Sequence, residues 1–415
     1  MSVQDLFKVS SPMLLPMILL SLVGASDWPQ FRGPNADAHV VGMTVPLEWS
    51  ETKNVVWKAD LPGLGWSSPV IVDDTIYVTT AVVKDSAMSL RAMAIDATNG
   101  KTIWDREIRS VEKVPAIHVK NSHASPTPIV HDGSVFVHFG NQGMARLNAK
   151  DGAIEWTCFD IEYNPVHGCG GTPVLCRGKL IVSCDGSKDP FVIGVDAKSG
   201  QIAWKTPRTT FAPISHSFGT ATIAQVDGKT QVLSPGPGMF AAYDPDTGTE
   251  LWKVNSHGWS IVPQPALGFG MVFYNHDYDH PEILAVKLGG QGDVTEKNVA
   301  WRMKSGAPST PSPLLVGEAL YTVSDKGVAT CVNAKTGERY WTGRLGGNFS
   351  SSPVYVNDRI LFMDEDGAAT WVKTGEDFEV LGKNTLPGRT FATPAFSKGA
   401  MYLRTDSALY KIAEK

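Results

Sequence analysis

The sequence is poor in cysteine and lacks the motifs of the common catalytic and metal centres. Its five cysteines all lie between residues 158 and 331 of the 415-residue chain, and their spacing matches neither a zinc ribbon nor a Cys-x-x-Cys redox site. No Gly-x-Ser-x-Gly elbow, His-Glu-x-x-His motif, P-loop or EF-hand loop is present. The sequence therefore predicts no catalytic residue and favours a protein that is not an enzyme.

Basic charge and helical periodicity are also missing. The net charge is −5 and the isoelectric point is near 6.1, so the chain has no electrostatic footprint for nucleic acid, which we exclude as a partner. No apolar pattern with a helical period runs far enough to predict a helical domain. The 40 glycines and 27 prolines suit an all-β protein with many turns.

The N-terminus carries a short apolar run that is typical of a secretory signal. Residues 13–20 are almost entirely apolar, Lys8 precedes them, and small residues at 23–25 offer a cleavage point. The run is too short for a membrane span. We predict a signal peptide over residues 1–25 and a periplasmic or secreted protein without stable membrane insertion; an uncleaved N-terminal anchor is the alternative.

Seven segments share one pattern: a proline, a turn residue five positions later and an apolar residue eight positions later. The copies are Pro69/Asp74/Tyr77, Pro128/Gly133/Phe136, Pro173/Gly178/Ile181, Pro265/Gly270/Phe273, Pro313/Glu318/Tyr321, Pro353/Asp358/Leu361 and Pro394/Gly399/Tyr402. An eighth copy around Ala221 lacks the proline. Repeats at a spacing of 40–59 residues predict a radial array of small sheets.

A second repeat, Asp/Asn-x-x-x-Gly-x-x-x-Trp, marks a hairpin in each of five units. The acidic or amide side chain can bond its own turn, the glycine can take a positive φ, and the tryptophan falls in the following strand. We predict a structural docking role between neighbouring sheets for seven tryptophans: Trp57, Trp104, Trp156, Trp204, Trp252, Trp301 and Trp341. Leu381 is expected at the tryptophan place of the remaining unit.

Eight outer-strand and eight inner-strand positions predict an all-β, eight-bladed β-propeller of four-stranded antiparallel blades. The chain opens with an outer strand at 55–61 and closes with three strands at 393–397, 400–404 and 409–413. Joining these ends completes the last blade and removes exposed edges. We therefore expect an arm at residues 26–54 packed across the ring, a propeller at 55–415, and a monomer.

The loops that lead into the inner strands and those between the second and third strands should share one face. These loops supply the candidate binding residues Trp66, His123, His167, His216, His257, Trp259, His276, Asp277, His280, Asp364 and Asp366. Three interpretations compete: a solvated polar face, a partner-binding face anchored by Trp66 and Trp259, and a cation or ligand site. Whether a metal ion binds at this face is left open.

Pairing of the cysteines is also left open. Cys184 falls diagonally opposite Cys169 across the turn at 177–178, so a bridge between them and free buried thiols are the two alternatives. Nothing in the spacing assigns partners to the whole set of Cys158, Cys169, Cys176, Cys184 and Cys331.

The unit from Asp196 to Lys205, Asp-Ala-Lys-Ser-Gly-Gln-Ile-Ala-Trp-Lys, resembles the tryptophan-docking repeat of quinoprotein dehydrogenases, the pyrroloquinoline quinone (PQQ) repeat. The same repeat builds BamB. The stretches 27–35 and 64–70 are similar to exported PQQ-like propellers of planctomycete type. The resemblance implies an eight-bladed exported propeller but no established activity.

This chain departs from both groups that share the repeat. Quinoprotein alcohol dehydrogenases carry an adjacent cysteine pair, which is missing here, and BamB-like lipoproteins carry an anchoring cysteine, which is also missing. We therefore predict no cofactor and a non-catalytic propeller that binds a protein, a peptide or a surface polymer. The alternative is a quinone- or metal-dependent oxidoreductase, with PQQ and calcium at the channel mouth.

Overall fold

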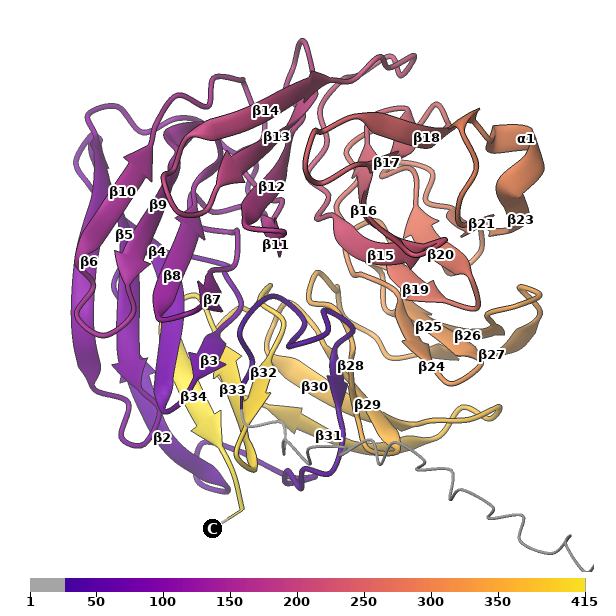
Figure 1. The fold of residues 1–415 in the computed structure, drawn as a ribbon. Coiled ribbons are helices and arrows are strands. Elements are labelled where there is room, and N and C mark those ends of the chain that lie inside the picture. The colour runs from indigo at the N-terminus through magenta and orange to yellow at the C-terminus, as the bar shows by residue number, and fades with distance from the viewer. Residues whose placement is uncertain (1–26, 415) are drawn as a thin grey trace, which may run out of the picture.

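The computed structural model describes residues 27–414, which form eight small antiparallel sheets arranged as blades around a central axis (Figure 1). From the axis outward, four blades are β3 (Val70–Val72), β4 (Thr75–Lys84), β5 (Ala87–Asp96) and β6 (Thr102–Val111); β7 (Ile129–His131), β8 (Ser134–His138), β9 (Met144–Asn148) and β10 (Ile154–Cys158); β11 (Val174–Cys176), β12 (Lys179–Cys184), β13 (Phe191–Asp196) and β14 (Ile202–Pro207); β15 (Thr222–Val226), β16 (Lys229–Gly236), β17 (Met239–Tyr243) and β18 (Glu250–Asn255).

The other four blades are β19 (Ala266–Gly268), β20 (Met271–Asn275), β21 (Ile283–Lys287) and β23 (Val299–Met303); β24 (Leu314–Val316), β25 (Ala319–Val323), β26 (Val328–Asn333) and β27 (Arg339–Arg344); β28 (Val354–Val356), β29 (Arg359–Met363), β30 (Ala368–Lys373) and β31 (Val380–Thr385); β32 (Ala395–Ser397), β33 (Ala400–Arg404), β34 (Ala408–Ile412) and β2 (Val55–Asp60). Two short strands extend a blade by parallel pairing: β1 (His39–Val40) joins β28 and β22 (Gly292–Asp293) joins β18. The helices in the described residues are the short α1 (Thr295–Asn298) and the 3-10 turn η1 (Gly140–Gln142).

The predicted eight-bladed propeller and its closure are confirmed. Strand β2, from the start of the chain, pairs antiparallel with β34 at its end, so the last blade combines both ends of the propeller. Figure 1 shows the indigo β2 beside the yellow β34. This pairing supplies hydrogen-bond partners to two strands that would otherwise be free edges.

The hairpin repeat folds as its residues dictate. Asp96 Oδ1 accepts the backbone N–H of Thr98 at 2.7 Å, and Gly100 takes a φ of +75°. In the preceding blade of the ring, Trp57 donates its indole N–H to Ala97 O at 3.1 Å, and a Cβ added to Gly100 would lie 2.9 Å from the Trp57 ring. The glycine therefore supplies both the turn conformation and the room for the indole.

Most of the other repeat tryptophans make the same contact with the next blade. In five cases the indole N–H donates to a backbone carbonyl of the next blade: Trp104 to Ala149, Trp156 to Ala197, Trp204 to Pro245, Trp301 to Ala334 and Trp341 to Gly375. Trp252 is different, because it donates to Gln231 Oε1 within its own blade at 2.9 Å. The blade that follows Trp252 has an irregular third turn that contains β22 and α1.

The expectation for Leu381 is wrong by one residue. Each outer strand contains a bulge just before its tryptophan, as between the pairs Ala94–Trp104 and Ile95–Thr102. In β31 the bulge skips Leu381, so Gly382 pairs with Trp371 and occupies the tryptophan place. The arm fills the space: Leu47 lies against Gly382, and Trp49 packs edge-on against Trp371 at 6.1 Å.

The arm, residues 27–54, crosses the ring on the face that carries the turns between the first and second strands of the blades. Trp28 and Ile71 exchange two backbone hydrogen bonds at 2.7 and 2.9 Å, and Val130 N–H donates to Pro29 O. The buried guanidinium of Arg32 donates to Pro313 O at 2.8 Å, and burial lowers its pKa to about 10. The arm thus ties together blades that are distant in sequence.

All five cysteines are buried and free, so the alternative of free thiols holds and Cys169 and Cys184 form no bridge in this structure.

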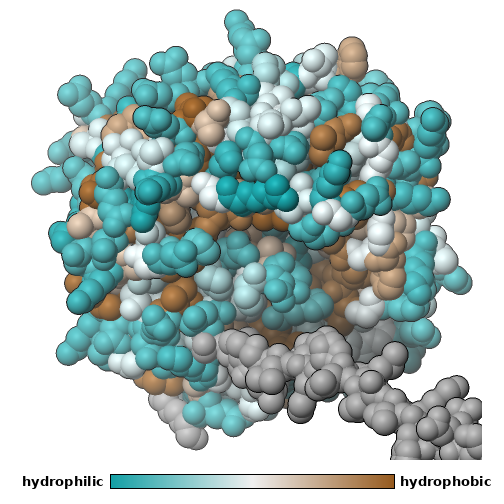
Figure 2. All heavy atoms as spheres, viewed as in Figure 1, coloured by the Kyte–Doolittle hydropathy of each residue, from teal (hydrophilic) through white to brown (hydrophobic). Residues whose placement is uncertain are grey.

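Within residues 27–414 no helix has the length and apolar character needed to cross a membrane. The predicted signal peptide at 1–25 lies outside the described residues. The surface seen from the side of Figure 1 is mainly hydrophilic, with scattered apolar side chains and a hollow near the ring axis (Figure 2).

Candidate functional site

A cavity of about 390 Å³ lies on the ring axis, open at the face of the loops that lead into the inner strands. This face is called the loop face below. The cavity has a polar base, an aromatic and imidazole wall, and a charged rim. Its side chains come from the loops that lead into all eight inner strands, so the closed ring assembles it from the whole length of the chain.

The base of the cavity is a belt of hydroxyl side chains, each two residues before the first residue of an inner strand. The members of this hydroxyl belt are Ser68, Thr127, Thr172, Thr220, Ser312, Ser352 and Thr393. Each hydroxyl oxygen accepts the backbone N–H of the equivalent residue in the preceding blade, at 3.0 or 3.1 Å. The belt therefore joins neighbouring blades at their innermost points. Gln264 occupies the eighth position and does not line this cavity.

The arm bounds the cavity beneath the belt. Phe31 is part of the cavity lining, while the neighbouring Arg32 bonds to Pro313, the residue after belt member Ser312. Phe31 therefore forms the floor of the cavity on the arm side.

Three histidines form one wall. The ring centroids of His118 and His167 are 5.5 Å apart, those of His167 and His216 are 5.1 Å apart, and both pairs meet edge to face. Phe218 packs beside the last two. Burial, followed by the neighbouring imidazole, lowers the pKa of His167 and of His216, which favours the neutral form of both rings.

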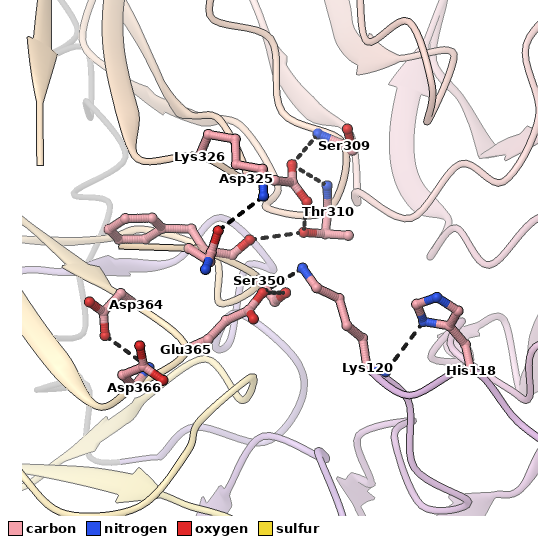
Figure 3. A network of polar contacts seen from close by, with 12 residues as sticks. His118, Lys120, Ser309, Thr310, Asp325, Lys326, Ser350, Asp364, Glu365 and Asp366 are labelled. Carbon is pink, nitrogen blue, oxygen red and sulfur yellow. Dashed lines mark hydrogen bonds and ion pairs between the residues drawn. The ribbon is translucent and has the colours of Figure 1, made fainter. Parts of the chain in front are cut away.

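An ion pair spans part of the rim. Lys120 Nζ lies 2.7 Å from Glu365 Oε1, although the two residues belong to loops of non-adjacent blades. Ser350 donates its hydroxyl to the same oxygen at 2.7 Å. Figure 3 shows Lys120 reaching from beside His118 toward Ser350 and Glu365. Lys120 is the one lysine in the cavity lining, and it is therefore already paired with a carboxylate.

Nearby, Asp325 orders the approach to belt residue Ser312. Its carboxylate accepts the backbone N–H groups of Ser309 and Thr310 at 2.6 and 3.2 Å and the Thr310 hydroxyl at 2.6 Å (Figure 3). These bonds occupy both carboxylate oxygens. Asp325 therefore holds the loop and is not a free group at the rim.

The structure brings together only part of the predicted binding face. Four of the eleven candidates line the cavity: Trp66, His167, His216 and Trp259. The rest lie outside its lining: His123, His257, His276, Asp277, His280, Asp364 and Asp366.

Most of these outlying residues have local partners or face solvent. His276 Nε2 lies 2.7 Å from Glu282 Oε2, and Asp277 and Asp364 accept backbone N–H groups of their own turns. Burial raises the pKa of Asp364 and lowers that of His123. His257, His280 and Asp366 are exposed.

The two aromatic candidates differ in access. Trp66 is only 8% exposed, packs on Phe391 with ring centroids 4.6 Å apart, and has a buried indole N–H without a hydrogen-bond acceptor. Trp259 is half-buried and stands at the wall. Trp66 is therefore part of the cavity framework, whereas Trp259 is available to an incoming ligand.

Sequence reasoning missed the belt, His118, Lys120, Phe218, Tyr278 and Glu365. The belt had a signal, since Ser or Thr precedes the inner-strand proline in six of the seven proline repeats, and Thr220 precedes Ala221 in the degenerate copy. His118 and Lys120 had none, because their place at the mouth depends on the path of the loop between β6 and β7. In residues 27–414 no group of three or more His, Cys, Asp or Glu side chains is placed to hold a metal ion.

Comparison with known proteins places the repeats in one family. The family model described as "Outer membrane protein assembly factor BamB" matches residues 48–213, 188–287 and 292–412. These matches together cover nearly the whole propeller.

Individual relatives are distant. The chain is 24% identical over 328 residues to BamB of Moranella endobia (strain PCIT), an alignment that covers 78% of this chain and 66% of the relative. Among solved structures, BamB from Moraxella catarrhalis matches with a TM-score of 0.58 at 16% identity, over 87% of this chain and 97% of that one. A europium-containing methanol dehydrogenase matches with a TM-score of 0.64 at 13% identity, over 92% and 90%. At these identities the structural matches show the fold alone.

Proposed function

Because the chain belongs to the BamB family of β-propellers, we propose that it is a non-catalytic, exported propeller that binds an extended polypeptide at its loop face. The proposal is carried by the floored cavity at the ring axis. Scaffold function alone would need no such cavity. A volume of about 390 Å³ suits one side chain or one chain end, and it is far smaller than a folded partner.

The wall and rim support a peptide ligand. Trp259, Phe218 and Tyr278 offer aromatic surface, which is the side-chain type that dominates binding energy at protein interfaces. Val119, between lining residues His118 and Lys120, is 86% exposed. A peptide that places one residue in the cavity can therefore bury further apolar surface as it crosses the rim.

The quinone alternative fits these residues poorly. PQQ carries several carboxylates, and the one lysine in the lining, which is already paired with Glu365, cannot neutralise them together. Calcium needs several oxygen ligands in one place, and the described residues, 27–414, include no grouping of three or more acidic, His or Cys side chains that could hold a metal. The residues present do not match the requirements of PQQ with calcium, and we derive no reaction through it.

Export is part of the same proposal. The Moranella endobia relative is named as an outer membrane protein assembly factor, and the apolar run at residues 13–20 is typical of a secretory signal. We place the protein in the periplasm or outside the cell. The N-terminal sequence of protein recovered from the envelope fraction should begin near Ser26; a chain that keeps Met1 and fractionates with cytosol would contradict export.

Peptide binding can be tested with immobilised protein and a pool of randomised heptapeptides, with the retained peptides read by mass spectrometry. We expect the protein to retain a subset, and His167→Ala and Trp259→Ala to lose it. Phe269→Ala is the matched control, because Phe269 is 44% exposed and lies outside the cavity lining. Retention that survives both cavity variants would overturn the site, provided that all variants keep the wild-type melting temperature within the range of the control.

A further inference from the structure

The hydroxyl belt has unused hydrogen-bond donors. Each of its seven oxygens accepts one backbone N–H, but in the described part of the chain none of the seven O–H groups has a protein acceptor. A serine or threonine hydroxyl carries one donor in addition to its acceptor sites. Accepting the N–H leaves that donor free, and all seven residues line the same cavity.

The free O–H groups decide what a ligand group at the belt must offer. A hydrogen-bond donor that loses water and gains no acceptor costs free energy. A group that reaches the belt is therefore favoured when it accepts several hydrogen bonds.

Charged acceptors are scarce at this depth. The Glu365 oxygen that faces Lys120 already receives two donors, from Lys120 and Ser350, and Asn121 Oδ1 receives the backbone N–H of Ser122 and the hydroxyl of Ser125. Asp279, the one carboxylate in the lining, is exposed at the rim. A ligand ammonium would therefore find no carboxylate at the belt to pair with its charge.

We propose that the hydroxyl belt binds a carboxylate on the ring axis, and that the ligand is a polypeptide which enters with its free C-terminus first. The proposal rests on the function proposed above. A carboxylate accepts through two oxygens with about four lone-pair sites, and O–H donors form short, strong bonds to an ionised oxygen. Phe31 bounds the cavity beneath the belt, so a chain that enters from the loop face and ends at the belt presents its terminal carboxylate there.

The test compares two matched pools of randomised heptapeptides on the immobilised full-length protein, one with free C-terminal carboxylates and one amidated. We expect about tenfold or greater enrichment of the free-acid pool, the size expected for loss of a charge-assisted hydrogen-bond group. Benzoate and benzamide, titrated directly into the protein by calorimetry, identify the source of the carboxylate. Binding of benzoate and not benzamide, while neither peptide pool is retained, would support the carboxylate site but overturn the polypeptide as its ligand.

Variants locate the site. Thr172→Val removes one belt hydroxyl with little change of shape and should reduce the preference for the free acid about tenfold, whereas Thr172→Ser should keep it. Thr322→Val controls for lost stability, because Thr322 is equally buried, donates to Gly306 O at 2.9 Å and lies outside the cavity. Equal retention of acid and amide pools would overturn the carboxylate inference and leave peptide binding standing. Retention of neither pool and no binding of benzoate would overturn both.

Discussion

The backbone N–H of Thr393 donates to the hydroxyl oxygen of Ser68 at 3.1 Å, although 325 residues separate them. This bond joins the last blade to the first at the hydroxyl belt, and the last blade is itself completed by β2 from the start of the chain, which pairs with β34 from its end. The ring is thus sealed twice, once at the outer rim by strand pairing and once at the axis by a side chain. The axial seal also forms the base of the cavity, which links closure of the fold to the site.

Removing that seal should weaken the fold. Ser68→Ala leaves the buried N–H of Thr393 without an acceptor and should lower the free energy of unfolding by about 1–3 kcal/mol. Ser68→Thr should retain stability, because four of the seven belt positions carry threonine. Urea-induced unfolding measures both. An alanine variant as stable as the wild type would show that water or a backbone shift replaces the bond.

The glycine under each docked tryptophan should be less tolerant than a glycine in an open turn. Gly200 and Gly178 have φ values of +74° and +71°, but a Cβ on Gly200 would lie 2.6 Å from the Trp156 ring, whereas nothing lies within 4 Å of one on Gly178. Gly200→Ala should cost about 1–3 kcal/mol more than Gly178→Ala because of this overlap. Equal melting temperatures for the two variants would contradict the proposed role of the glycine.

The arm should stabilise the blade whose outer strand, β31, lacks the repeat tryptophan. Trp49 is 4% exposed and packs on Trp371 beside Gly382, so Trp49→Ala should cost about 3–5 kcal/mol through the cavity it leaves. Val41→Ala is the control in the same arm, since Val41 is 69% exposed, and should change stability by less than about 0.5 kcal/mol. Chemical unfolding of both variants gives the comparison; similar costs would mean that the arm contributes nothing specific at β31.

Acid should destabilise the protein through His138. Burial lowers the pKa of His138 to about 4 from an ordinary value of 6.5, so the folded state binds fewer protons than the unfolded state between these values. Stability from this group is therefore complete above pH 6.5 and is lost as the pH falls toward 4, by about 3 kcal/mol. Asp185 acts in the opposite sense, since burial raises its pKa to about 7.

The contribution of His138 can be isolated by difference. The stability of the wild type relative to His138→Gln, measured by urea unfolding at several pH values, should fall between pH 6.5 and 4, and Asp185 cancels because both proteins contain it. His131→Gln is the control, as the His131 side chain is 58% exposed. A difference that stays constant with pH would mean that His138 titrates normally in the folded protein.

The sequence by itself determined the blades, their number and the closure of the ring. The information is local: Asp96 bonds its own turn, Gly100 takes the positive φ, and the prolines mark where each inner strand starts. Such features depend on residues a few positions apart, so their spacing can be read directly. The count of outer and inner strands then required β2 to complete the last blade.

Only the tertiary structure decided which side chains meet at the axis and what fills the irregular places. His118 reaches the cavity while His123 does not, because loop path and not distance from the proline sets the direction of a loop side chain. Gly382 replaced Leu381 because a bulge shifts the pairing register by one residue, and the arm filled the resulting space from far away in the chain. Convergence of distant loops and packing of the arm depend on the closed ring, and no local spacing encodes them.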